Sequence, residues 1–224
     1  MIDKLIACIK RHDEISDYEI TSTHSEKAQL FFVLNKLETN RATDNTSVSA
    51  TIYVKHDEYL GSASLVLNAA DDDETIENKI KDAIKIAKTI NNPCFELEKD
   101  KDSPQSELVS IQNRDLKDVA LKTAKAIIKA DKDKEGWLNS IEVFVRRNSH
   151  HLVNSQGVDR RFEKTSLFAE IIPTWKGKDE EVELYLSFNM ITEDYEAITQ
   201  KARDILLEAK RRSEAVKPSG KMLK

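Results

Sequence analysis

The sequence predicts an α+β protein built from two modules, each an antiparallel sheet packed with helices. Three observations lead to this class. Apolar residues recur at helical spacing in four segments, they alternate with polar residues in other short segments, and the strand-like segments come in consecutive groups. Because a doubly wound parallel sheet needs a helix after almost every strand, consecutive strands favour antiparallel sheets.

The first module is predicted over residues 1–92. A short helix fits Ile2 to Ile9, and the most regular helical pattern runs from Ile76 to Ile90. The acidic run at 71–74 precedes that pattern, where carboxylates suit the unpaired amides of a helix N-terminus. Strand character lies between the two helices, around residues 18–20, 30–34, 48–54 and 60–67, and the polar residues 55–59 are predicted to connect the last two strands as a hairpin.

A charged segment at 93–114, which contains Pro104, is interpreted as a linker. The second module is predicted over residues 115–214 and is followed by a tail at 215–224. Its elements are a helix at 116–128, strands at 141–146, 162–172 and 182–188, and a last helix at 193–214.

Composition excludes some classes of function. Forty acidic residues against 35 basic ones give a net charge of −5, with both signs mixed along the chain, whereas a nucleic-acid coat or an anionic-membrane binder needs a concentrated positive face. No segment approaches the roughly 20 apolar residues that span a bilayer, and the first ten residues do not resemble a signal peptide. A cytoplasmic location is therefore expected, with Cys8 and Cys94 as free, buried thiols.

The sequence contains no complete catalytic or metal-binding motif. None of the five histidines has the spacing of a zinc-protease helix, and the five glycines form neither a phosphate loop nor a nucleophile elbow. His150 and His151 are adjacent, but neighbours on a strand point to opposite faces and cannot readily share a metal ion. No catalytic residue and no metal ligand is assigned.

The most distinctive local feature is the segment Asn154-Ser155-Gln156-Gly157. Asn and Gly tolerate left-handed backbone angles, and Asn and Ser side chains bond nearby amides, so a tight turn between strands explains all four residues. A second interpretation is that Asn154, Ser155 and Gly157 position a peptide or a partner.

This segment resembles the Asn-Ser-x-Gly turn in the middle domain of the TldD/PmbA family. The strand pair Thr51–Val54 and Leu60–Ser64 and the Ala-containing helix at 80–87 are similar to family features in the same order. The last helix and the following residues 217–220 resemble the passage into the family's third domain. The resemblance covers most of the chain, although each motif is short.

The resemblance implies a protein related to metal-dependent peptide cleavage by paired TldD and TldE (PmbA) subunits, a family also called modulator of DNA gyrase. The family's His-Glu-x-x-x-His motif and its zinc-type metal belong to a C-terminal domain that nothing in this sequence matches. The chain is therefore expected to be either the first two domains of a longer protein or a naturally short member. Neither case gives a cofactor within these residues.

Three functional hypotheses remain open at this point. The first is a non-catalytic N-terminal region of a TldD/PmbA-like protein that binds a peptide and a partner, either a TldD-like subunit or a second copy in a dimer. The second is a free-standing metal-dependent hydrolase that uses His150 and His151. The third is a nucleic-acid-linked modulator, for which the acidic balance offers no electrostatic support.

Overall fold

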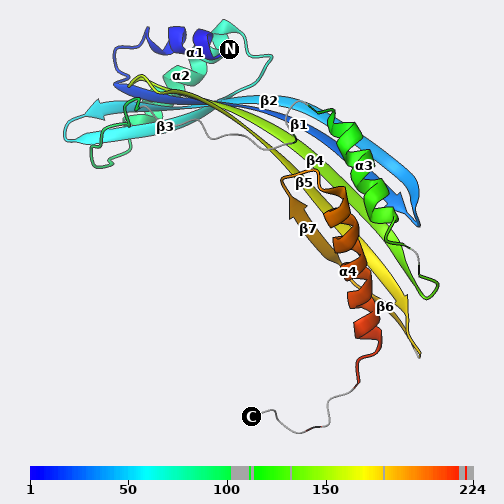
Figure 1. The fold of residues 1–224 in the computed structure, drawn as a ribbon. Helices are drawn as coiled ribbons and strands as arrows, with labels where there is room; N and C mark the ends of the chain where they lie inside the picture. Colours follow the sequence, from blue (N-terminus) through cyan, green and yellow to red (C-terminus); the bar gives the residue numbers. More distant parts are fainter. Residues whose placement is uncertain (102–110, 112–113, 132, 179, 217–219, 221–224) are drawn as a thin grey trace. The chain divides into compact units, whose positions relative to one another are not determined.

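The structure is a computed structural model that describes residues 1–101, 111, 114–131, 133–178, 180–216 and 220 (Figure 1). It confirms the α+β class. The elements in chain order are α1 (Ile2–Ile9), β1 (Asp17–Val33), β2 (Lys36–His56), β3 (Tyr59–Leu67), α2 (Asp73–Ala87), α3 (Leu116–Ile128), β4 (Gly136–Asn154), β5 (Asp159–Lys176), β6 (Glu181–Glu183), β7 (Leu186–Met190) and α4 (Tyr195–Ser213).

Within the described residues the strands form one seven-stranded sheet, whereas the sequence predicted two separate sheets. Its order is β3-β2-β1-β4-β5-β6, and β7 also pairs with β5. Two-residue turns join β1 to β2 and β2 to β3, and Leu34, Asn35 and Asp57 have the positive φ angles that tight hairpins require. The antiparallel register of β2 and β3 places Ile52 beside Ala63 and Val54 beside Gly61, which confirms the predicted strand pair and its hairpin.

The chain divides into two compact units, and each takes three separate stretches of sequence. The first unit contains residues 1–25, 44–107 and 148–164, and the second contains 26–43, 108–147 and 165–224. Strands β1, β2, β4 and β5 each contribute residues to both units. Residues 148–164, which the sequence assigned to the second module, therefore belong to the first unit.

The first unit has a core between the sheet and two helices. Ile20, Ile52 and Leu67 from the strands and Ile76 and Ile80 from α2 are fully buried together. Figure 1 shows α1 and α2 near one another, and α2 also packs on β3. Each apolar stripe predicted from the sequence faces this core because burial removes its apolar surface from water.

Gly61 allows α2 to approach β3 closely. A Cβ atom at this position would lie 1.8 Å from the carbonyl oxygen of Ala87, the last residue of α2. Backbone atoms cannot yield as a flexible side chain does. The strand therefore requires a residue without a side chain at this point.

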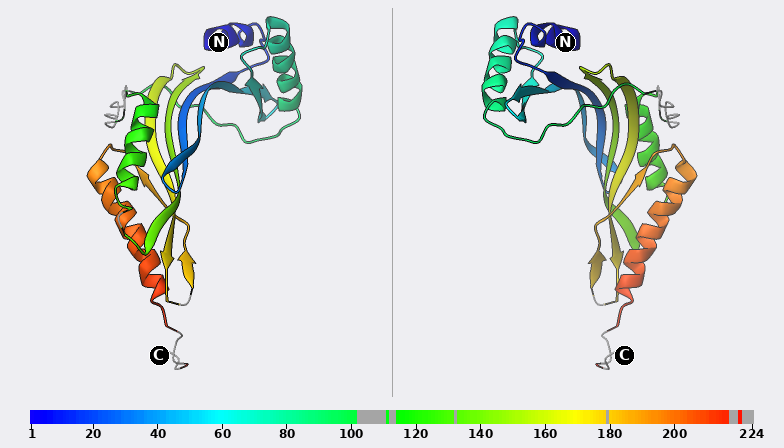
Figure 2. Two further views of the ribbon diagram at one scale, coloured as in Figure 1. Left: turned by 90° about the vertical axis from the view of Figure 1, so that its right-hand side faces the viewer. Right: turned by 90° about the vertical axis from the view of Figure 1, so that its left-hand side faces the viewer.

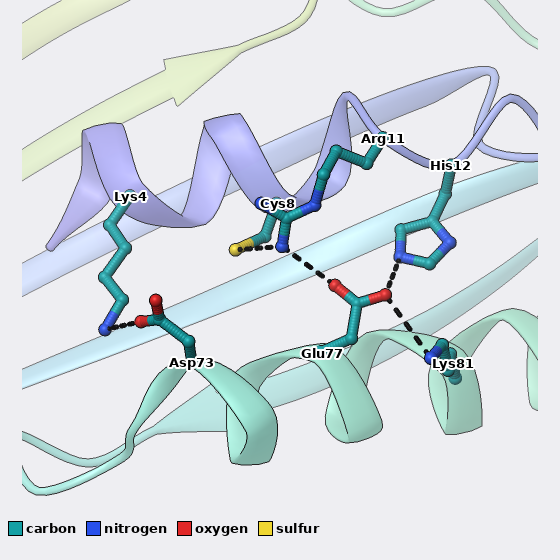
Figure 3. A network of polar contacts seen from close by, with 7 residues as sticks. All are labelled: Lys4, Cys8, Arg11, His12, Asp73, Glu77 and Lys81. Atoms are coloured by element: carbon teal, nitrogen blue, oxygen red, sulfur yellow. Dashed lines mark hydrogen bonds and ion pairs between the residues drawn. The ribbon is translucent and has the colours of Figure 1, made fainter.

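Polar contacts join the residues that follow α1 to α2 around the Glu77 carboxylate (Figure 3). Glu77 is paired with Arg11 at 3.0 Å, with His12 at 2.9 Å and with Lys81 at 3.5 Å. The hydrogen bond from Arg11, together with the nearby charges of His12 and Lys81, lowers the pKa of Glu77 although desolvation opposes the shift. Arg11 also donates to the sulfur of buried Cys8 at 3.1 Å.

The helix N-termini follow the sequence-based expectation. Asp72, within the predicted acidic run, caps α2 by accepting from the backbone amide of Thr75 at 2.8 Å. Asp115 and Asp194 cap α3 and α4 in the same way. Within the acidic run, Asp72 is thus the capping residue, whereas Asp71 pairs with Lys79 at 2.6 Å and Asp73 pairs with Lys4.

The second unit packs α3 and α4 against one face of its strands (Figure 2). Val143, Val145 and Leu167 on the strands and Ala124 and Ile198 on the helices are fully buried in one core. The predicted helix at 116–128 matches α3, and the last predicted helix matches α4 to within two residues at each end.

Two details differ from the sequence-based expectations. Cys94 is exposed rather than buried, because the chain after α2 runs along the surface. Ile111, placed in the linker, is fully buried in the core of the second unit. The rest of that linker at 102–110 and 112–113, and tail residues 217–219 and 221–224, lie outside the described residues. No helix in the described part of the chain is both long and apolar enough to cross a bilayer.

Candidate functional site

Asn154 organises the turn between β4 and β5. Its buried side-chain oxygen accepts from the backbone amides of Gln156 and Val158, each at 2.9 Å, and its side-chain nitrogen donates to the carbonyl oxygen of Glu98 at 2.8 Å. The backbone amide of Asn154 donates to Val158 at 3.0 Å, which closes the hairpin. The turn predicted from the sequence is present, and the same side chain also holds the segment after α2.

Ser155 and Gln156 fasten the turn to the start of β1. The Ser155 hydroxyl and the Gln156 side-chain amide both donate to one carboxylate oxygen of Asp17, at 2.6 Å and 2.7 Å. The backbone amide of Ser155 donates to Tyr18 at 3.0 Å, and the amide of Tyr18 donates back to the Ser155 hydroxyl at 3.3 Å. Two segments about 138 residues apart in sequence are thereby fixed together.

Position 157 requires glycine because of its backbone angles, and not because a side chain would lack room. Its φ angle is +91°, and a Cβ atom would find no heavy atom within 4 Å. Only glycine adopts this angle without strain. Of the three residues predicted to bind a peptide or partner, Asn154 and Ser155 thus hold the turn through hydrogen bonds, and Gly157 supplies its shape.

A pocket of about 500 Å³ opens beside this turn, entirely within the first unit. Asp17 and Gln156, the partners just described, form part of its wall. The other lining residues are both charged and apolar: Ser16, Lys55, Leu60, Cys94, Phe95, Glu96, Leu97 and Lys99. Two acids, two lysines and three apolar side chains thus combine charge and apolar surface in one pocket.

Sequence reasoning missed half of this pocket because residues 94–99 read as linker. Their position follows from contacts on both sides: Leu60 donates its amide to Asn92 at 3.0 Å, and Asn154 holds the carbonyl of Glu98. Farther on, Arg160 pairs with Asp100 at 2.5 Å. The signal that could have located this segment was Phe95, a large aromatic residue in a mostly polar stretch. Its ring packs edge-on against that of Tyr53, with 5.6 Å between the ring centroids.

Tyr53 packs against Phe95, and its surroundings strongly raise the pKa of its hydroxyl group. Its hydroxyl donates to the Glu19 carboxylate at 2.6 Å. Burial and this hydrogen bond to a negative group raise the pKa of Tyr53 far above its ordinary value, and burial alone raises the pKa of neighbouring Tyr18. Tyr53 is therefore a neutral hydrogen-bond donor at physiological pH.

The two adjacent histidines have different partners. The Nδ1 atom of His150 lies 3.1 Å from the Thr23 hydroxyl, and its ring stacks on that of Phe162 with 4.5 Å between the centroids. The Nε2 atom of His151 lies 2.8 Å from the Asp159 carboxylate, and His151 lines a second pocket of about 410 Å³. The two imidazoles are thus not brought to one site, as alternation along a strand predicts.

The sheet edges differ in how much backbone they leave open. At β3, the Leu60 amide is bonded to Asn92 and the Val66 carbonyl accepts from Lys79 at 3.0 Å. Alternate residues of a strand direct their backbone groups to the same side. The outward backbone groups between these two points therefore belong to Ser62 and Ser64. Strand β7 pairs with β5 along five residues, and in the described part of the chain its other edge carries no further strand.

The fold and the pocket define the class: an α+β protein with a mixed polar and apolar pocket beside an Asn-Ser-x-Gly turn. No family model matches the sequence, and no curated protein matches it. Solved structures do match. TldE from Thermococcus kodakarensis has a TM-score of 0.67 and 19% identity to this chain, with 92% of this chain and 47% of that one covered.

Two further structures are similar. A proposed modulator of DNA gyrase from Thermotoga maritima has a TM-score of 0.67 at 16% identity, with 92% and 47% of the two chains covered. Another from Bacteroides thetaiotaomicron has a TM-score of 0.65 at 14% identity, with 92% and 48% covered. The chain thus has the fold of about half of these proteins, as the resemblance to the TldD/PmbA family implied, and it spans about half their length.

Proposed function

We propose that this chain is a non-catalytic N-terminal region of a TldD/PmbA-like, peptidase-related cytoplasmic protein, and that it binds a peptide segment and a partner subunit. The observation that carries the proposal is the pocket of about 500 Å³ beside the Asn154–Gly157 turn. The shared fold with TldE supports it, as does the Asn-Ser-x-Gly turn itself.

The geometry supports a holding role for this pocket. Its wall is braced by Asp17, which accepts two hydrogen bonds from the turn, and by Asn154, which fixes the opposite segment. Bracing of this kind lowers the entropy lost when a ligand binds. Lys55 and Glu96 offer opposite charges to a peptide backbone or its side chains, and Leu60, Phe95 and Leu97 offer apolar contact.

Peptide binding is tested by fluorescence anisotropy with a labelled pool of random-sequence octapeptides. The Phe95→Ala and Lys55→Glu variants should weaken binding several-fold because they remove an apolar wall and reverse a charge in the pocket. Phe162→Ala is the matched control, since Phe162 is exposed to a similar extent but does not line this pocket. Equal binding by all four proteins would refute the pocket as the peptide site.

Partner binding is tested by size-exclusion chromatography with light scattering, using the chain alone and mixed with a TldD-like subunit. A complex, or a dimer of the chain itself, is expected. A chain that stays monomeric with every such subunit would argue against this part of the proposal.

The alternative, a free-standing metal-dependent hydrolase using His150 and His151, makes a different prediction. Elemental analysis of the purified chain would then find zinc in stoichiometric amount, and His151→Ala would abolish its retention. A non-catalytic holding role instead leaves the zinc-type metal of such proteins to a C-terminal domain, and under it we expect no bound zinc in this chain.

A further inference from the structure

The second unit carries an aromatic and acidic surface on the face of its strands that α3 and α4 do not cover. Val143, Leu167 and Ala169 point into the helix-covered core, so their neighbours in sequence point to the opposite face. We call this surface the open-face patch; its residues are Phe31, Glu142, Phe144, Phe168, Glu170 and Tyr185, all in the second unit.

Three aromatic rings cross adjacent strands β1, β4 and β5 in the open-face patch. The centroids of Phe31 and Phe144 are 5.8 Å apart with nearly perpendicular planes, and those of Phe144 and Phe168 are 5.7 Å apart. All three side chains are only partly buried. A row of half-buried aromatic rings on a sheet face offers both apolar area and negative ring faces.

One guanidinium group already sits at an end of this row. Arg41 from β2 lies over the ring of Phe31, 5.4 Å from its centroid. This is the geometry of a cation–π contact. The patch therefore accepts a guanidinium group at Phe31, and Phe144 and Phe168 continue the same row.

Two carboxyl groups lie next to the rings and interact with each other. Burial raises the pKa of Glu142, the neighbouring Glu170 raises it further, and the charge of Arg41 opposes both effects. The Tyr185 hydroxyl hydrogen-bonds to Glu170, and this raises the pKa of Tyr185. Two acidic side chains thus lie beside the rings, with one guanidinium, that of Arg41, acting on Glu142.

We propose that the open-face patch is a docking site for an arginine side chain of a partner protein. A guanidinium group is planar, so it can stack on Phe144 and Phe168, and its forked donors can engage Glu142 and Glu170 together. A lysine ammonium would supply the charge but neither the flat face nor the fork. This site is separate from the pocket beside Asn154 and does not depend on the function proposed for that pocket.

The test is an NMR titration of the full chain with three small probes: N-acetyl-arginine methylamide, its citrulline analogue and its lysine analogue. Citrulline has nearly the shape of arginine without its charge. Saturable shifts of the backbone amides around Phe144, Phe168 and Glu170 are expected with the arginine probe at millimolar concentration. The lysine probe should bind at least fivefold more weakly, and the citrulline probe should not saturate.

Variants identify the groups responsible. The double variant Glu142→Gln/Glu170→Gln should weaken arginine binding at least tenfold and should remain folded, because it removes repulsion between the two carboxylates. Glu180→Gln/Glu181→Gln is the matched control, an equal change of charge on exposed residues outside the patch. Equal binding of arginine and lysine probes, unchanged binding in the patch double variant, or no saturable shift up to about 50 mM would each overturn the proposal.

Discussion

Asn154 shows how one side chain can serve two structural purposes. It satisfies two amides within its own turn and one carbonyl of a segment far away in sequence. The residue types at 154–157 predicted the turn, because Asn and Gly have recognisable backbone preferences. The contact with Glu98 was not predictable, since nothing in a sequence marks which distant carbonyl will meet a free amide group.

At this residue we expect Asn154→Ala to destabilise the protein by about 1–3 kcal/mol, because it removes three partly buried hydrogen bonds. Urea unfolding followed by circular dichroism measures the change. Asn189→Ala is the control, since Asn189 is an exposed strand residue. Similar losses in both variants would show that the bonds of Asn154 are not the cause.

Gly157 gives a second test of the same turn. We expect Gly157→Ala to cost about 1–2 kcal/mol because an alanine at a φ of +91° is strained. The space around Gly157 is open, so no steric clash contributes. An unchanged unfolding midpoint would mean that the turn relaxes to another conformation without cost.

Among elements, helices were more predictable than strands. The stripe of α2 and its capping residue Asp72 follow directly from the sequence, because a 3.6-residue period that follows a capping carboxylate is specific to a helix. Strand β2 begins at Lys36, and its first twelve residues are all exposed, so they carry no alternation to detect. They pair with β1 through backbone hydrogen bonds, and side-chain patterns do not record such bonds.

The contact of α2 with β3 predicts a sharp difference between two substitutions on one strand. Gly61→Val should destabilise the protein by about 3 kcal/mol or more, because its side chain would meet the backbone of Ala87. Ser64→Val introduces the same residue on the exposed face of β3 and removes one exposed hydrogen bond to Thr51, so it should change the free energy of unfolding by less than about 1 kcal/mol. Thermal unfolding of the two variants side by side makes the comparison, and equal losses would contradict the close approach.

The contact of α2 with the residues that follow α1 predicts a dependence of stability on pH. The pKa of Glu77 in the folded protein is lower than its ordinary value of 4.5. Its ion pairs therefore stabilise the protein at pH values above 4.5, and this stabilisation is lost as the pH falls through the lower folded pKa. Glu77→Gln should therefore be less stable than the parent at neutral pH, and the difference should shrink below about pH 4.5. Urea midpoints at several pH values test this; a gap that stays constant with pH would assign the loss to packing.

At the scale of the whole molecule, the two units share their strands. Ile52→Ala would leave a cavity in the core of the first unit and cost about 2–5 kcal/mol. Because the strands are shared, we expect this substitution to lower the stability of the second unit as well. Both tryptophans, Trp137 and Trp175, lie in the second unit, so their fluorescence reports on it alone. We expect the tryptophan and circular dichroism midpoints to fall together. Val66→Ala, at an exposed position, is the control.

The overall division was the least predictable property of the chain. The sequence suggested two successive modules separated near residues 93–114, because a charged, proline-containing stretch usually marks a boundary. The units instead interleave, since the β4–β5 hairpin is long enough to take part in both. Pairing across such distances depends on which strands meet, and no local pattern specifies that.

This interleaving constrains when the protein can fold during its synthesis. The turn that binds Asp17 lies at residues 154–157, and the first unit takes its last stretch from residues 148–164. Before residues 101–224 are translated, residues 1–100 supply α1, α2 and strands β1 to β3, and β1 has no β4 to pair with. Such edges attract other chains. The first unit is therefore complete only after residues 148–164 have been translated, and until then the edge of β1 is open to pairing with another chain.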